Sequence, residues 1–297
     1  MKALPQVNWI GGTVLTLCLV LWQPLEALGW RAGYLPGSAL VLALAGGGLA
    51  VPADLELTTV NPAHLIGSQG QSFEYGYLRM FGGLGGHTLR WQGHPYGKPT
   101  QLGLRSLSED RLELRGDIPT AEPLAYFGAH LVTVTLRRGY RLGSTSLGIG
   151  LTGAYQRIFH YSARGLWLTA GWRGSFSPAL SWGLAAHNLG YGQALNSEAE
   201  ATGARLGAGL AYQAAFMAST IGVDLWYDGR YGAWPVLSWQ AGGQILRLYA
   251  GLRWIPGAVL VSTGFRLTHH RWSLTYAVGF QEAALGLPQM LTVGRIL

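Results

Sequence analysis

Charge and cysteine are both scarce in this sequence. Charged residues make up only 12% of its 297 residues, about half their usual share in soluble domains. A soluble protein with so little charge would expose large apolar patches and would tend to aggregate. The single cysteine, Cys18, excludes a disulfide framework and a cysteine-based zinc site. These shortages argue against an ordinary soluble enzyme and favour a membrane protein.

Long hydrophobic runs are also missing. No segment has the ~18 or more consecutive apolar residues that a membrane-spanning helix needs, so a helical bundle is not expected. Residues 1–29 combine an early lysine, a short apolar run and a small-x-small ending. This is the layout of a secretory signal peptide, and an uncleaved anchor helix is the alternative. Cys18 would leave with the signal.

Lysine is nearly absent. Of the 21 basic residues, only Lys2 and Lys98 are lysines. The arginines that supply the net charge of +7 are scattered singly along the chain. A nucleic-acid-binding protein would gather them on one face, so no nucleic-acid partner is expected. The 14 acidic residues are fewer than the 21 basic ones, and none lies between Pro123 and Ser197.

From about Gln71 onward, large apolar residues alternate with small or polar ones. In residues 271–280 one face holds Trp272, Leu274 and Tyr276, while the other holds Ser273 and Thr275. Residues 146–156, 205–213 and 247–254 repeat the pattern. Strict alternation predicts β-strands, since successive side chains point to opposite faces. About fourteen such segments are found, with twelve as the alternative count; they centre near residues 76, 90, 103, 133, 151, 168, 185, 208, 222, 238, 250, 262, 275 and 293.

These strands fit a membrane barrel better than a soluble sheet. Trp272 and Phe280 lie about 27 Å apart on one apolar face, close to the ~25 Å band with aromatic girdles of outer-membrane barrels. The connections near residues 138–144, 159–162 and 268–271 are short, as in an up-and-down meander. A sheet in lipid must also close on itself. We therefore predict an all-β, transmembrane, antiparallel up-and-down barrel over residues 71–297, after a plug-like segment at residues 30–70.

One acidic stretch interrupts the alternation, between Ser106 and Gly128. Its carboxylates alternate with Arg111 and Arg115 and do not follow the EF-hand spacing. We interpret it as a solvated loop in which acids and arginines pair; calcium binding or partner docking is the alternative.

Motifs for catalysis are weak throughout. The match to Gly-x-Gly-x-x-Gly at residues 148–153 lies inside an alternating strand, where small residues facing a lumen explain it better than a nucleotide does. The eight histidines show no metal-binding spacing, and no nucleophile elbow is present. Asp224 is interpreted as a lumenal ion-pair partner. The sequence predicts a non-enzyme with no catalytic residues, no metal site and no cofactor.

Several arginines fall on the predicted lumen side. An amphiphile's carboxylate or phosphate head could bind to such a cationic interior. The alternative is that these arginines pair with the few lumenal acids or with lipid head groups. The strand register places the following residues there: Arg137, Arg173, Arg205, Arg247, Arg253, Arg266 and Arg271.

The N-terminal motif Asn61-Pro62-Ala63 follows a run of small residues and resembles the start of the FadL superfamily of outer-membrane barrels. More specifically, the chain resembles the PorV/PorQ branch of that superfamily over about residues 36–297. The resemblance rests on the order of several segments: 109–123, 147–158, Ser162-Ala-Arg-Gly-Leu166, His187-Asn-Leu-Gly190, Leu274-Thr-Tyr-Ala277 and Leu285-Gly286.

This resemblance implies a fourteen-stranded barrel in the bacterial outer membrane, with the N-terminal segment folded into or against the lumen. It implies a component of protein secretion or surface attachment of the type IX kind, with secretion proteins or secreted cargo as partners besides outer-membrane lipid. A FadL-like channel for a hydrophobic or amphiphilic small molecule is the alternative. A membrane-anchored hydrolase on a barrel scaffold is a third and more distant one.

Overall fold

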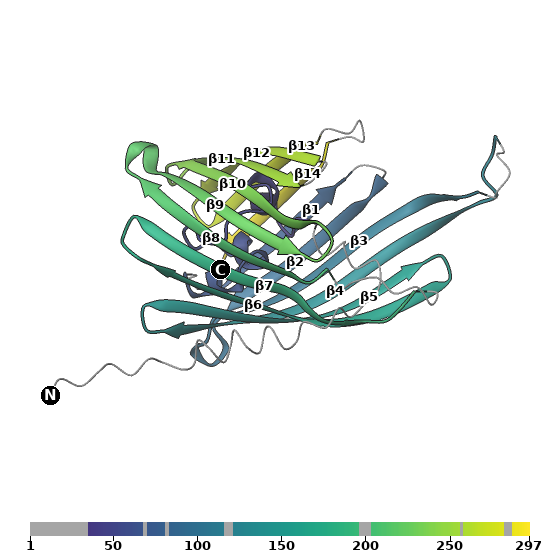
Figure 1. Ribbon diagram of the computed structural model, residues 1–297, viewed down its shortest axis with the longest axis horizontal. Coiled ribbons are helices and arrows are strands. Elements are labelled where there is room, and N and C mark those ends of the chain that lie inside the picture. Colours follow the sequence, from purple (N-terminus) through teal and green to yellow (C-terminus); the bar gives the residue numbers. More distant parts are fainter. Residues whose placement is uncertain are drawn as a thin grey trace.

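The computed structural model describes residues 35–67, 70–80, 83–115, 121–195, 203–255, 258–281 and 287–297. The predicted signal peptide at residues 1–29 lies outside this part of the chain. Figure 1 shows strands that curve around an interior containing the N-terminal helices. Among the described residues, no helix is long and apolar enough to cross a bilayer.

Fourteen antiparallel strands form one closed barrel, in which each strand pairs with its neighbours in sequence and β1 pairs with β14. The predicted up-and-down topology and strand number are thereby confirmed. The strands are β1 (Ser72–Arg79), β2 (Gly85–Gly93), β3 (Thr100–Leu114), β4 (Ala125–Leu142), β5 (Thr145–Ile158), β6 (Tyr161–Ser175), β7 (Leu180–Gly192), β8 (Arg205–Ala214), β9 (Ser219–Asp228), β10 (Gly232–Gly242), β11 (Leu246–Ile255), β12 (Ala258–His269), β13 (Trp272–Gln281) and β14 (Gln289–Ile296). Short 3-10 helices η5 (Pro95–Gly97) and η6 (Phe216–Ala218) lie in two of the connections.

The alternation in the sequence separates the two faces of the wall. In β8, for example, Leu206 and Leu210 are 37% and 50% exposed on the outside, whereas Gly207 and Gly209 are buried on the inside. Trp272 and Phe280 are exposed at the two ends of β13. An apolar exterior of this kind is stable in lipid and leaves the small residues to line the lumen. The Gly-x-Gly-x-x-Gly match lies within β5, as predicted.

The barrel wall is uneven in height. Strands β3 to β7 have 13 to 18 residues, whereas the others have 8 to 12. The three longest connections, β7–β8, β3–β4 and β13–β14, are all at the end opposite to the one where the chain finishes. Outer-membrane barrels have short periplasmic turns and longer outer loops, so we assign the long connections to the outer end.

The loop predicted between Ser106 and Gly128 is largely wrong. β3 continues to Leu114 and β4 begins at Ala125, with a register shift between Glu109 and Leu112. The β3–β4 hairpin extends beyond the other strands (Figure 1). Acidic side chains on this part of the hairpin therefore reach water and do not prevent strand pairing. The expected pairing of acids with arginines is present on the hairpin, because Arg115 Nε donates to Glu113 Oε2 at 2.7 Å.

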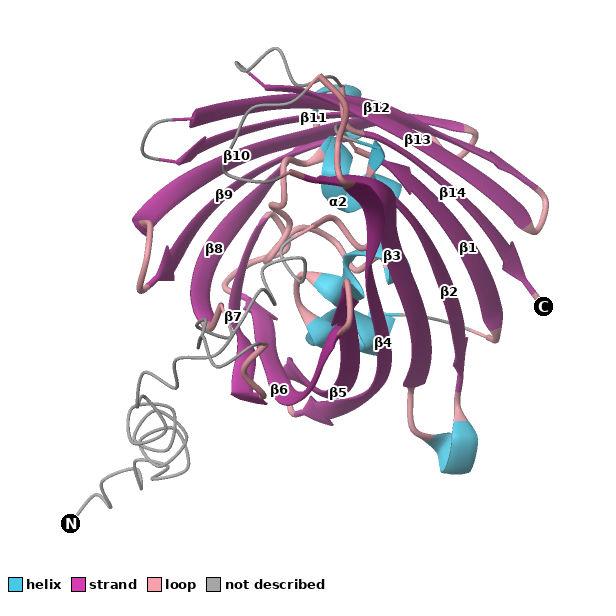
Figure 2. Cartoon of the chain, turned by 90° about the vertical axis from the view of Figure 1, so that its right-hand side faces the viewer, coloured by secondary structure: helices cyan, strands magenta, loops and turns pink. Residues whose placement is uncertain are grey.

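Three short helices of the N-terminal segment lie inside the barrel, as Figure 2 shows. They are α2 (Ala39–Ala43), η2 (Leu55–Thr59) and η3 (Pro62–Gly67). Ser38 caps α2 by accepting a hydrogen bond from Val41 N at 3.3 Å, and all five residues of α2 are buried. α2 packs against β11 to β14, and η3 packs against β4 to β6. We call residues 38–67 the plug.

Candidate functional site

The Asn-Pro-Ala motif anchors the plug. Asn61 is fully buried; its Nδ2 donates to the carbonyl of Leu49 at 3.0 Å, and its Oδ1 accepts from Ala63 N at 3.0 Å. The second bond is an Asx cap that starts η3. A side chain at Gly148 of β5 would collide with the backbone of Pro62 and Ala63. The motif therefore fits a wall position where only glycine leaves enough room.

A second anchor joins η3 to β6. His64 Nε2 lies 2.9 Å from the carbonyl of Gly48, and its Nδ1 lies 3.3 Å from Arg173 Nη1. Because arginine only donates, Nδ1 accepts and Nε2–H donates, which is the neutral tautomer. Arg173 also donates to the carbonyl of Val51 at 2.8 Å. Thus Arg173, predicted as a lumenal ligand contact, binds the plug.

Arg266 of β12 holds the acidic end of the plug. Its guanidinium forms a bidentate ion pair with Asp54 and also reaches Glu56 Oε1 at 2.8 Å. Glu56 additionally accepts from Thr275 Oγ1 at 2.6 Å and from Leu40 N at 3.0 Å. Glu56 is buried, and Arg266 and Asp54 are mostly shielded, with side-chain exposures of 15% and 17%. Charges in such surroundings are tolerated when they are paired and hydrogen-bonded. We call Arg266, Asp54 and Glu56 the latch.

Asp224 of β9 has a partner that we did not predict. Its Oδ2 accepts hydrogen bonds from the backbone N–H groups of Gly48 (2.6 Å) and Leu49 (3.3 Å). The expected arginine partner is replaced by two plug amides that converge on one carboxylate. The interpretation of Asp224 as an ion-pair residue was therefore wrong, although its lumenal position was right.

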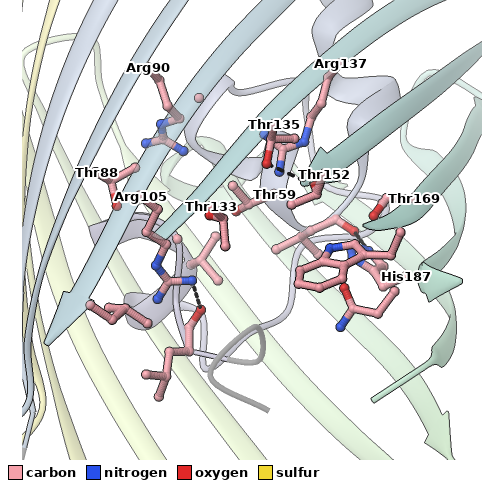
Figure 3. A pocket seen from close by; sticks show the side chains of 18 of the residues that line it. Thr59, Thr88, Arg90, Arg105, Thr133, Thr135, Arg137, Thr152, Thr169 and His187 are labelled. Atoms are coloured by element: carbon pink, nitrogen blue, oxygen red, sulfur yellow. Dashed lines mark hydrogen bonds between the residues drawn. The ribbon is translucent and has the colours of Figure 1, made fainter. Parts of the chain in front are cut away.

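A cavity of about 110 Å³ lies between the plug and the tall side of the barrel. Val41, Gly46, Thr59 and Val60 of the plug border it, together with Leu35 and Gly37 just before the plug. Strands β2 to β8 and β11 supply the wall. Among the described residues, its lining holds five arginines, six threonines and neither Asp nor Glu; the arginines are Arg90, Arg105, Arg137, Arg205 and Arg253. Figure 3 shows Arg90, Arg105 and Arg137 around one side of this space. The cavity is basic and hydroxyl-rich.

Beside the cavity the wall between β6 and β7 is irregular. The register shifts between Leu168 and Ala170, and Asn188 of β7 has a left-handed backbone with φ 56°. The β7–β8 pairing ends at His187, so residues 188–192 extend past the start of β8. His187 and Asn188 both line the cavity, and His187 Nε2 lies 2.7 Å from the carbonyl of Val60.

The predicted lumenal arginines therefore divide into groups. Arg205 and Arg253 line the cavity, with Arg205 stacked over Trp226 at 4.4 Å. Arg247 faces inward on β11 outside the cavity lining. Arg271 was expected to face the lumen, but it is exposed in the β12–β13 turn. β12 ends at His269, so Arg271 lies outside the strand and has no inward face to occupy.

Arg90 and Arg105 were missed by the sequence prediction. The signal was present, because each lies in phase with lumenal neighbours, Thr88 on β2 and Gly103 on β3. Among the described residues, no group of three or more His, Cys, Asp or Glu is placed to hold a metal ion. The charged groups of the cavity thus suit an anion.

Plug binding is expected to weaken as the pH falls from 7.5 to 5.0. Burial, together with the charge of Arg173, lowers the pKa of His64 to about 3 from 6.5, against the opposing effects of Gly48 and Asp54. A released His64 therefore takes up a proton that the docked one lacks, and docking loses stability below pH 6.5. The loss at pH 5.0 is about 2 kcal/mol.

Protease accessibility of the plug, measured in the purified barrel across this pH range, checks the prediction. His64→Gln keeps a donor for Gly48 and removes the titration, so its plug should respond less to pH. Burial raises the pKa of Asp54, but the charge and hydrogen bond of Arg266, the amide of Glu56 and the nearby His64 together lower it more. The pKa of Asp54 therefore lies below its usual 3.8, and Asp54 does not contribute in this window. An equal pH response in wild type and His64→Gln would contradict the assignment.

Solved structures of two toluene transporters share this fold. The Ralstonia pickettii toluene transporter TbuX aligns with a TM-score of 0.64 at 10% identity, over 92% of this chain and 99% of that chain. The Pseudomonas putida toluene transporter TodX aligns with 0.62 at 14% identity, over 92% and 98%. The deltaS2S3 mutant of the monoaromatic hydrocarbon channel TodX aligns with a TM-score of 0.63 at 11% identity, over 93% of this chain and 100% of that chain.

No protein-family model matches this sequence, and no curated protein matches it. The structural likenesses confirm the predicted fold class, a closed antiparallel barrel of fourteen strands. A closed barrel with an apolar exterior is the architecture of bacterial outer-membrane proteins, which agrees with the predicted location. The narrower resemblance to PorV and PorQ stays a prediction.

Proposed function

We propose that this protein is a non-enzymatic outer-membrane channel that admits hydrophobic or amphiphilic small molecules from the outer surface. The observation that carries the proposal is the cavity between the plug and the tall wall, next to the irregular β6–β7 segment. A pre-formed cavity above a plug is what a solute needs for capture before passage. The likeness to two toluene transporters supports the same conclusion.

The alternative expectation, a role in protein secretion or surface attachment, has less support. The plug fills the lumen on the side of β11 to β14 and at η3, so a polypeptide has no obvious path through the barrel. The transporter likenesses also favour small solutes. Secretion proteins and cargo as partners therefore stay predictions from the resemblance alone.

Uptake measurements test the channel directly. Bacteria that lack their own channel for such compounds would express this protein, and uptake of labelled toluene and labelled dodecanoate would be followed over time. We expect faster uptake of at least one of them than in cells with an empty vector. Equal uptake with the barrel shown to be folded in the outer membrane would refute the proposal.

A further inference from the structure

Three arginines come together on adjacent strands of the cavity wall. Arg90 of β2, Arg105 of β3 and Arg137 of β4 all line the cavity (Figure 3). Gly103 lies between them in register, facing Arg90 on β2, while Gln101 faces Arg137 on β4. A Cβ at Gly103 would lie 3.8 Å from Arg90 Cγ and 3.9 Å from Arg137 Nη1. We call Arg90, Arg105 and Arg137 the basic cluster.

The basic cluster is only partly neutralised by the protein. Arg90 Nε is 2.9 Å from Glu74 Oε2, and among the described residues Glu74 is the one carboxylate paired with the cluster. Arg105 donates to the carbonyls of Leu35 and Pro36 at 3.1 Å each, and Arg137 donates to Gln101 Oε1 at 2.9 Å. Three guanidinium charges against one carboxylate leave two positive charges in excess.

Some of the donors in this region are unused. Arg90 Nη1 and Arg137 Nε are buried and have no hydrogen-bond partner among the described residues. Arg253, on the β11 side of the same cavity, makes no hydrogen bond or ion pair with any described residue, and its Nε is buried. Buried charges need a counter-charge. The arrangement therefore favours an anion in the cavity.

The surroundings of the basic cluster are graded in polarity. Threonines 88, 133 and 135 lie on the same strands and place hydroxyl groups beside the guanidiniums. One step toward the outer end of the wall, Leu107 pairs with Leu131, and Trp167 completes an apolar border. A ligand that meets both zones has a charged oxygen-rich head and an apolar remainder.

We propose that the cavity binds the dianionic head of a phosphate monoester, with its apolar group toward Leu107 and Trp167. This inference rests on the proposed channel function and names its substrate class. Two excess charges match a dianion better than a carboxylate, and arginine forks bind phosphate oxygens in pairs. The threonine hydroxyls hydrogen-bond the remaining oxygens.

Binding to the full-length purified barrel tests the inference with three probes of the same ring and different heads. Phenyl phosphate, benzoate and benzyl alcohol would be titrated by calorimetry at pH 7.5. We expect phenyl phosphate to bind at least tenfold more tightly than benzoate, and benzyl alcohol more weakly still. Benzoate that binds as tightly as phenyl phosphate would overturn the proposal.

Substitutions locate the site. Arg137→Gln is expected to weaken phenyl phosphate binding at least tenfold and to leave benzyl alcohol unchanged. Arg138→Gln is the matched control, because Arg138 is the next residue of β4 and by strand alternation lies on the outer face, outside the cavity lining. Equal loss in both variants, or no loss in either, would overturn the proposal. Heat-modifiable mobility on gels confirms that each variant forms a barrel.

The two proposals fail separately. If cells take up toluene or dodecanoate but the protein shows no preference for phenyl phosphate, the channel stands and the phosphate inference is wrong. If phenyl phosphate binds in an arginine-dependent manner while uptake of every probe equals that of the empty-vector cells, the site stands and the channel proposal is wrong.

Discussion

Replacing Arg266 with methionine is expected to release the plug and open the barrel to ions. The substitution keeps the length of the side chain but removes the charge shared by Asp54 and Glu56. Among the described residues, both carboxylates then keep only Thr275 and backbone amides as hydrogen-bond partners in the lumen. Removing one member of a buried ion pair costs about 3–5 kcal/mol, which raises the undocked fraction by roughly two to four orders of magnitude.

Conductance in planar bilayers measures this release. The wild type should show a low conductance, and Arg266→Met should show frequent large openings. Arg247→Met is the control, because Arg247 faces Arg266 across the β11–β12 ladder and forms no ion pair with a described carboxylate. Should the two variants conduct alike, the latch does not hold the plug.

Gly148→Leu is expected to have an effect of similar size from the opposite side of the barrel. Even a Cβ at this position overlaps the backbone of Pro62 and Ala63. Overpacking against side chains costs about 1–3 kcal/mol, and backbone cannot rotate away as a side chain can. The Asn-Pro-Ala motif should therefore no longer pack against β5, while β5 keeps its pairing with β4 and β6.

Protease cleavage within residues 50–67, together with conductance, checks this result. Gly153→Leu is the matched control: Gly153 is on the same strand, and a Cβ there meets nothing within 4 Å. A plug as protected in Gly148→Leu as in the control would show that the contact at Gly148 is not required. Combining Gly148→Leu with Arg266→Met should then add little, because each change alone undocks the plug.

The barrel was predictable from the sequence because its signal is local. Each strand has its own alternation, as β8 and β13 show, and the outward face of every strand must be apolar because it contacts lipid. The boundaries were harder where the wall rises out of lipid. Acids such as Glu109 and Glu113 suggest a loop, yet they are accommodated on a strand that reaches water. The alternating pattern also continues to Arg271 in the sequence, although the strand ends at His269.

The site was less predictable because its contacts join distant parts of the chain. The sequence indicated that Arg173 and Arg266 face inward, but their partners depend on where the plug crosses the lumen. Asp224 binds two backbone N–H groups, and such donors cannot be recognised from residue types because every non-proline residue has one. Arg90 and Arg105 could have been found by applying the alternation to β2 and β3.

The positions of the plug contacts also bear on how the chain folds. Ala39 N donates to Thr292 on β14, 253 residues away, and Glu56 reaches Thr275 across 219 residues. Contacts so distant in sequence form slowly, since the intervening chain must first be ordered. Thr292 belongs to the last strand, the one that pairs with β1 to complete the cylinder. The N-terminal segment therefore acquires its full set of partners only when the final strand arrives, so plug docking and closure of the β1–β14 seam are expected to be coupled late steps of assembly.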